Sequence, residues 1–133
     1  MMLLYVVFGL LAASGSDVDR TEKLKFRFGD HWVEFVRQAK GHFTVSAACV
    51  HKSGVLACDA YSALKQASLR DLDSELSGGI EPGAVVCDKR LKAKVVLGVD
   101  GKRNENSFCL LGDGSMVSLG GLAYHARKND SAK

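Results

Sequence analysis

The sequence predicts a small α+β domain in which one or two helices pack on a mostly antiparallel sheet and two disulfides stabilise the fold. Short stretches with alternating or β-branched residues are separated by Gly-rich turns, and two other stretches have helical spacing. Four cysteines lie in a chain of 133 residues. A chain of this length normally forms one domain.

The N-terminus has the pattern of an export signal. Residues 3–13 are apolar apart from Gly9, small residues follow at 14–16, and no charged side chain precedes Asp17. The run has the length of a signal-peptide core and is too short to span a bilayer, which takes about 20 residues. We expect residues 1–16 to be a signal peptide cleaved between 14 and 17, residues 17–133 to be the domain, and the protein to be secreted or periplasmic. A retained N-terminal helix is the alternative, because no Lys or Arg precedes the run.

The half from residue 17 to residue 80 is expected to contain the helices. Residues 23–28 alternate cationic and apolar side chains, which predicts a half-buried strand. A helix is expected from Asp30 to Gly41, because its apolar residues have i, i+3, i+4, i+7 spacing: Trp32, Phe35, Val36 and Ala39. Trp32 is then a core anchor.

A strand over residues 42–50 and a turn at residues 51–54 should follow. A second helix is predicted from Asp59 to Leu76, before the glycines at 78 and 79. The half from residue 81 to residue 133 reads as an antiparallel meander. Its strands are expected at 84–87, 94–99, 107–111 and 115–119, with turns at 100–101 and 112–114 and a short last segment at 122–127.

The four cysteines indicate disulfides, since an even number in a short exported chain is typical of a disulfide framework. Of the three possible connectivities we favour Cys49–Cys58 and Cys87–Cys109, because each pair is nearest in sequence and joins neighbouring elements. The alternative is a zinc site made of Cys49, Cys58, His42 and His51, but its spacing matches no paired-knuckle pattern. We expect no metal and no cofactor.

A net charge of +3 is too small to indicate nucleic-acid or membrane binding. Contacts to an anionic partner, either a protein or an envelope surface, are expected from one basic cluster on the predicted hairpin: Lys89, Arg90, Lys92, Lys94, Lys102 and Arg103. A second basic row, Lys23, Lys25 and Arg27, lies on one face of the first strand and either binds an acidic partner or protects a sheet edge. For both groups a solvated face is the alternative.

No catalytic residue is assigned. The four histidines are scattered, and neither G-x-S-x-G nor C-x-x-C is present. His51 and His125 are the two histidines we consider first. Residues 98–102 resemble part of a phosphate loop and residues 112–115 part of a calcium loop, but hairpin turns explain both stretches better.

Part of the second half resembles a known family. Residues 82–87, the Asp100-Gly101 turn and residues 107–115 together resemble the small exported bacterial "putative haemolysin" domain, whose biochemical function is not known. The resemblance covers residues 82–115 and implies a Cys87–Cys109 disulfide and a periplasmic or secreted setting. It implies no lytic activity.

The function expected from the sequence is therefore that of a small exported, noncatalytic binding or envelope-associated protein. One alternative is a secreted inhibitor or an immunity-type protein that acts on an enzyme. The other is a small exported hydrolase or redox enzyme that uses a histidine next to Ser, Asp or Cys.

Overall fold

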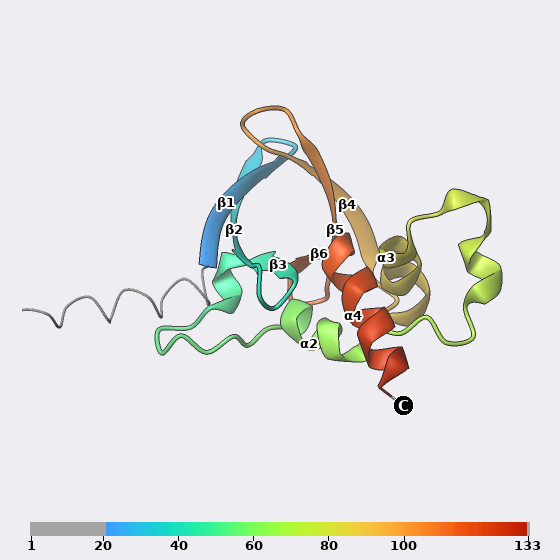
Figure 1. Cartoon of the computed structure of the whole chain (residues 1–133). Helices are drawn as coiled ribbons and strands as arrows, with labels where there is room; N and C mark the ends of the chain where they lie inside the picture. The colour runs from blue at the N-terminus through green and yellow to red at the C-terminus, as the bar shows by residue number, and fades with distance from the viewer. Residues whose placement is uncertain (1–20, 133) are drawn as a thin grey trace, which may run out of the picture.

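A six-stranded antiparallel barrel forms the centre of the molecule (Figure 1). The computed structural model describes residues 21–132, so the expected signal peptide lies outside the described residues. The strand order around the barrel is β1-β2-β3-β6-β5-β4, and β1 closes it by pairing with β4. The strands are β1 (Thr21–Phe28), β2 (His31–Gln38), β3 (Phe43–Ser46), β4 (Lys94–Val99), β5 (Glu105–Leu110) and β6 (Met116–Ser118).

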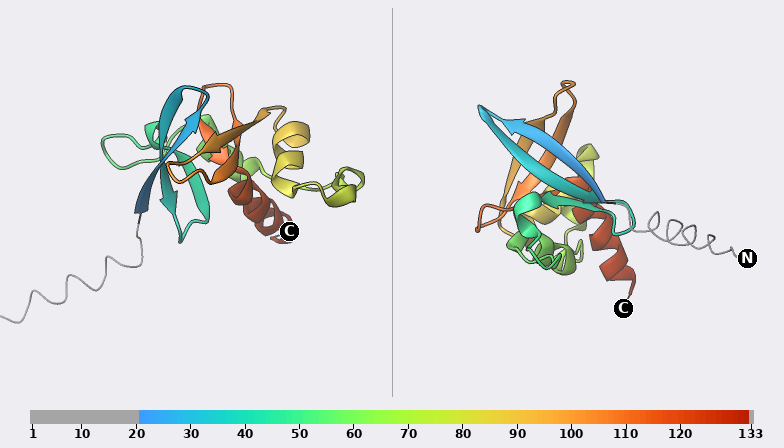
Figure 2. Two further views of the ribbon diagram at one scale, coloured as in Figure 1. Left: turned by 90° about the horizontal axis from the view of Figure 1, so that it is seen from above. Right: turned by 90° about the vertical axis from the view of Figure 1, so that its left-hand side faces the viewer.

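Helices lie on one side of this barrel (Figure 2). They are α2 (Asp59–Gln66), α3 (Pro82–Val85) and α4 (Leu119–Ser131), with shorter helical turns η2 (Ala47–Cys49), η3 (Asp73–Gly79) and η4 (Val86–Arg90). The molecule is thus a small α+β structure that contains two disulfides, as expected. The closure of its sheet into a barrel was not predicted.

Aromatic rings fill the barrel. The rings of Phe35 and Phe108 stack with their centroids 4.5 Å apart, and Phe26 meets Phe108 edge-on at 5.1 Å. A Cβ atom at Gly98 would lie 2.6 Å from the ring of Phe28, so a glycine at this position leaves room for that ring. The alternation in β1 predicted its inward residues, which are Leu24, Phe26 and Phe28.

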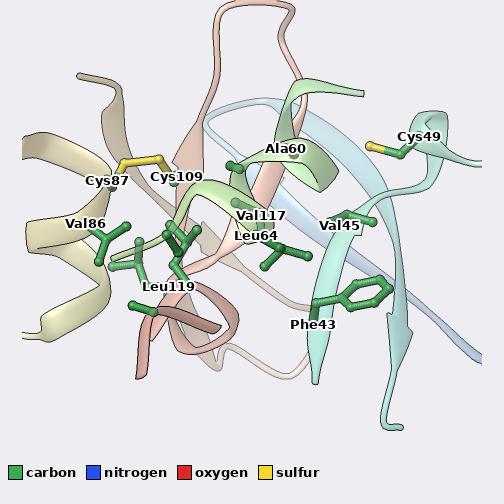
Figure 3. Packing of buried hydrophobic residues seen from close by; sticks show 14 of the residues in the cluster. Phe43, Val45, Cys49, Ala60, Leu64, Val86, Cys87, Cys109, Val117 and Leu119 are labelled. Carbon is green, nitrogen blue, oxygen red and sulfur yellow. A yellow bond between two sulfur atoms is a disulfide. The ribbon is translucent and has the colours of Figure 1, made fainter. Parts of the chain in front are cut away.

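A second core lies between the barrel's outer face and the helices (Figure 3). Val45, Cys109 and Val117 are fully buried on the outer face of β3, β5 and β6, whereas Leu64 of α2 and Leu122 of α4 pack from the helical side. Cys87 in η4 is bonded to Cys109 in β5, and Cys49 is bonded to Cys58. The first bond joins the helical layer covalently to the barrel, and both pairs are those that the sequence favoured.

The helix expected over residues 30–41 is wrong, because this stretch forms β2. Gly29, with a φ of +65°, and Asp30 make a two-residue turn that brings all eight residues of β2 into register with β1. A short apolar pattern fits the period of a helix as well as that of a strand, and here pairing with β1 overrides the helical spacing. Trp32 is consequently no core anchor: half of it is exposed, and Lys25 and Arg27 lie 5.6 and 6.0 Å from its ring.

The strand expected at residues 84–87 is also wrong, since residues 82–90 are helical in α3 and η4. The Glu81 carboxylate accepts a hydrogen bond from the Gly83 N–H at 2.6 Å, and Pro82 occupies the first helical position. Val85, Val86 and Cys87 are all buried, and a run of buried apolar residues fits a helix as well as a strand.

Other boundaries differ from the expectation. Strand β3 ends at Ser46 and is followed by η2, and α2 ends at Gln66 rather than continuing to Leu76. The last segment, expected at residues 122–127, is α4, a helix of 13 residues whose first turn contains Gly120 and Gly121. Ser118 caps this helix by accepting a hydrogen bond from the Gly121 N–H at 3.2 Å.

Asp130 near the end of α4 holds the segment that follows α2. Its carboxylate accepts hydrogen bonds from the Ser68 hydroxyl at 2.7 Å and from the Leu69 N–H at 2.8 Å, and Arg70 lies 3.4 Å away. These hydrogen bonds lower the pKa of Asp130 below its ordinary value, and the bond from the Ser68 hydroxyl contributes most. A lowered pKa in the folded state means that the ionised carboxylate stabilises the fold at neutral pH, and that this stabilisation is lost as the pH falls through the folded-state pKa.

We predict that Asp130→Asn lowers the free energy of unfolding at pH 7 by about 1 kcal/mol, because two hydrogen bonds to a charged acceptor weaken. The difference from the wild type should shrink as the pH falls below about 3.9, because the carboxylate of the unfolded chain then binds a proton while that of the folded protein is still ionised. Urea unfolding at pH 7 and pH 3 measures both values. Asp71→Asn is the control, and an equal loss at both pH values for Asp130→Asn would contradict the assignment.

Candidate functional site

The basic residues predicted to form one cluster lie at two ends of β4. Lys94 is the first residue of this strand, whereas Lys102 and Arg103 lie in the β4–β5 loop beyond its last residue, at the top of Figure 1. A six-residue strand is about 20 Å long. Lys89 lies 3.9 Å from the Glu75 carboxylate, so part of its charge is paired within the molecule.

Arg90 also has internal partners. Its guanidinium donates to the carbonyl of Arg70, and to the carbonyl of Ser68 at 3.4 Å. Lys92 follows at a positive φ of 55° in the turn that leads to β4. Lys89, Arg90, Lys92 and Lys94 therefore belong to the helical end of the molecule, and the structure does not bring Lys102 and Arg103 to them.

The zinc alternative is wrong, because the sulfur atoms of Cys49 and Cys58 are bonded to each other and cannot act as thiolate ligands. His51 lies in the loop between these cysteines, and its Nε2 is 3.0 Å from the Ala57 carbonyl oxygen. His42 lies elsewhere, against Tyr124.

The calcium-like stretch at residues 112–115 has a structural role. The Asp113 carboxylate accepts hydrogen bonds from the Asp59 N–H at 2.9 Å and from Ser115, and the Ser115 hydroxyl accepts one from the Ala60 N–H at 2.9 Å. Burial alone would raise the pKa of Asp113, but the hydrogen bonds from Asp59 and Ser115 bring it below its ordinary value. This turn therefore caps the first turn of α2.

The structure brings histidines, tyrosines and lysines from three elements to one groove of about 390 Å³. Helix α2 contributes one wall, α4 the other, and the chain between β2 and β3 the end. The residues that line it are Gln38, Lys40, Gly41, His42, Phe43, Tyr61, Leu64, Lys65, Tyr124, His125, Lys128 and Asn129. We call this set of residues the α2–α4 groove.

Two histidine contacts, one a ring stack and the other a hydrogen bond, fix the end of the groove. His42 has a φ of +55°, an uncommon conformation for a residue with a side chain, and its ring stacks on that of Tyr124 with the centroids 3.9 Å apart. The Nε2 of His125 lies 2.8 Å from the Gly41 carbonyl oxygen. A Cβ atom at Gly121 would come within 3.3 Å of the main chain of His42, so a glycine lets α4 approach this chain closely.

Hydrogen bonds hold the two walls of the groove together. The Asn129 side-chain amide on α4 donates to the carbonyl of Leu64 at 3.0 Å and to the carbonyl of Ala67 at 2.9 Å, at the end of α2. Tyr61 packs edge-on against Phe43 of β3 at 5.5 Å. The groove thus belongs to the packed fold and needs no ligand to assemble it.

Charges in the α2–α4 groove have one sign. Lys40, Lys65 and Lys128 line it, and within residues 21–132 no Asp or Glu is among its lining residues. The Lys65 ammonium lies 5.9 Å from the centre of the Tyr61 ring. A hollow of about 410 Å³ on the other side of the His42–Tyr124 pair also lacks a lining carboxylate. An electropositive groove with aromatic walls suits a cyclic ligand that has an anionic substituent.

The sequence pointed to only part of this groove. His125 was one of the two histidines considered first, whereas His42 was considered as a zinc ligand. A signal was present: α2 and α4 each place a Tyr four residues before a Lys, as in Tyr61–Lys65 and Tyr124–Lys128. Residues at this spacing share one helix face, so each pair puts a ring and a cation side by side.

Within residues 21–132, no helix is long and apolar enough to cross a membrane. Comparison of the chain with protein-family models, with curated proteins and with solved structures found no match. Any functional assignment therefore has to come from the chemistry of the site.

Proposed function

We propose that the protein is a secreted or periplasmic, noncatalytic binding protein whose α2–α4 groove takes an anionic glycan. Two disulfides in a short chain are typical of proteins from oxidising, non-cytoplasmic compartments. The apolar run at residues 3–13 supports export. The likeness of residues 82–115 to the exported haemolysin-type domain points the same way and stays a prediction.

One observation carries the choice of ligand, namely that three lysines and five aromatic or imidazole rings share a groove in which no described lining residue is a carboxylate. Lysine ammonium groups recognise sulfate and carboxylate groups, and the rings of Tyr61 and Tyr124 offer apolar surface to the flat faces of sugar rings. A volume of about 390 Å³ is within the range of small-ligand sites.

The alternative of an inhibitor or immunity-type protein is supported by a different region. The loop between Cys49 and Cys58 carries two exposed apolar side chains, Val50 and Val55, and the disulfide fixes the two ends of the loop. A constrained loop with apolar residues is suited to enter a cleft of another protein. Enzymatic alternatives have less support, because the hydrogen bonds recorded for His51 and His125 run to main-chain carbonyl groups.

Export predicts a definite covalent state. When the full-length gene is expressed with its natural leader, the intact protein should lack residues 1–14, 1–15 or 1–16. Its mass should rise by four units on reduction, because two disulfides take up four hydrogen atoms. Intact-mass spectrometry before and after reduction measures both. A full-length product with reactive thiols would contradict the proposed compartment.

The groove predicts a localised loss of binding. The double variant Lys65→Ala/Lys128→Ala should bind a sulfated disaccharide at least about tenfold more weakly than the wild type, because two charge-assisted contacts are lost. Titration calorimetry at low salt measures the affinity, and added salt should weaken binding of the wild type more than that of the variant.

Lys102→Ala/Arg103→Ala is the matched control, since it removes the same charge from the β4–β5 loop and should leave the affinity unchanged. The neutral disaccharide should bind neither protein measurably. A loss in the Lys102→Ala/Arg103→Ala variant instead of the groove variant would move the site to the tip of the barrel and refute the groove.

A further inference from the structure

The seam that closes the barrel is unusually short. Strand β1 pairs with β2 over eight residues, but it pairs with β4 only through Arg27 and Val99. In this antiparallel register Lys25 would face Gly101 and Lys23 would face Arg103, both of which lie in the β4–β5 loop.

The β4–β5 loop does not supply the missing partners. The Asp100 N–H donates to the Asn104 carbonyl at 2.9 Å, and the Arg103 N–H donates to the Asp100 carbonyl at 3.1 Å. The Lys102 N–H donates to the Asp100 carboxylate at 2.8 Å. These donors are used within the loop, so β1 has no strand beside Lys23 and Lys25 in the described part of the chain.

The main-chain groups of Lys23 and Lys25 point to this open edge. The two-residue turn makes Phe28 and His31 a hydrogen-bonded pair, so Phe28 and every second residue before it direct their N–H and C=O groups to β2. Arg27, Lys25 and Lys23 direct theirs to the opposite edge, where only Arg27 meets β4. Within residues 21–132, Lys23 and Lys25 therefore present four unpaired main-chain groups in a row.

Side chains along this edge alternate in chemistry. Lys23 and Lys25 are exposed on the outer face, whereas Leu24 is only partly buried against the aromatic core inside the barrel. A strand added beside them would place one set of its side chains next to the two ammonium groups and the other set next to Leu24. Cross-strand pairing thus favours an added strand that has acidic residues on the outer face of the barrel and apolar residues towards its core.

We propose that the open edge of β1 at residues 23–25 pairs with an extended segment of an acidic partner protein in which acidic and apolar residues alternate. This is the β-augmentation mode of peptide recognition, in which main-chain hydrogen bonds supply affinity and side chains supply specificity. A second copy of the chain does not suit the edge, because two β1 strands side by side bring lysines against lysines. The outer face next to the edge is hollowed by a cavity of about 570 Å³, with Val36, Ala47 and Val50 in its lining together with the carboxylate residue Glu34, which lies opposite Lys25 on β2. The proposal is independent of the α2–α4 groove.

The test uses the isotope-labelled full domain and an eight-residue peptide of alternating Glu and Val. Addition of the peptide should shift the amide resonances of Lys23 and Lys25 in a saturable way and slow their hydrogen exchange. Two further versions of the peptide have the amides of one edge or the other N-methylated. The version that blocks the pairing edge should fail to bind, and the other should bind like the parent. Equal binding of both versions would overturn the proposal, because no main-chain pairing is then involved.

Lys23→Glu/Lys25→Glu should weaken binding of the Glu-Val peptide at least tenfold, and Lys102→Glu/Arg103→Glu is the control with the same charge change. A Lys-Val peptide should not bind the wild type. Shifts confined to Val95 and Leu97 of β4, or line broadening that depends on protein concentration without any peptide, would overturn the proposal in favour of the other edge or of self-association.

Discussion

The whole arrangement depends on covering the outer face of β3, β5 and β6. Val45, Cys109 and Val117 lie on that face with no measurable exposure, and apolar surface of this extent is stable only when it is removed from water. Helices α2 and α4 provide the cover, and the Cys87–Cys109 bond joins η4 to the same face. The barrel and the helices therefore form one packed unit with two cores that share the same strands, the aromatic core inside and the aliphatic core outside.

The groove follows from this cover. A helix of eight residues such as α2 is marginal on its own, and here both of its ends are held by other elements. Asp113 and Ser115 bind the N–H groups of its first turn, and Asn129 binds carbonyl groups at its end. Because these contacts fix α2 between β3 and α4, the rings and ammonium groups at their border lie in one place. The main chain of the groove is thus already ordered, so a ligand of the proposed kind would have to order only side chains such as those of the lysines.

The sequence predicted the class of the fold and the strands whose residues alternate strictly or flank Gly turns, as β1, β4 and β5 show. It failed where a local pattern fits two structures. The spacing in residues 31–38 is helical, but the Gly29-Asp30 turn pairs the stretch with β1, and the buried run at 85–87 has no period that separates helix from strand. Barrel closure depends on one long-range pair, Arg27 with Val99, which leaves no local trace. The groove joins residues up to 91 positions apart, from Gln38 to Asn129, so only its i, i+4 pairs of Tyr and Lys were visible in the chain.

Anion recognition in the α2–α4 groove is the central claim, and the ring resonances of the domain test it most directly. Addition of a sulfated disaccharide should shift the side-chain signals of Tyr61, Tyr124, His42 and His125 together, with one dissociation constant, and should leave the Trp32 indole signal in place. The neutral disaccharide should shift none of them. If the sulfated sugar moves Trp32 while the four groove rings stay unchanged, the ligand binds the outer face of β1 and β2 and the account of the groove is contradicted.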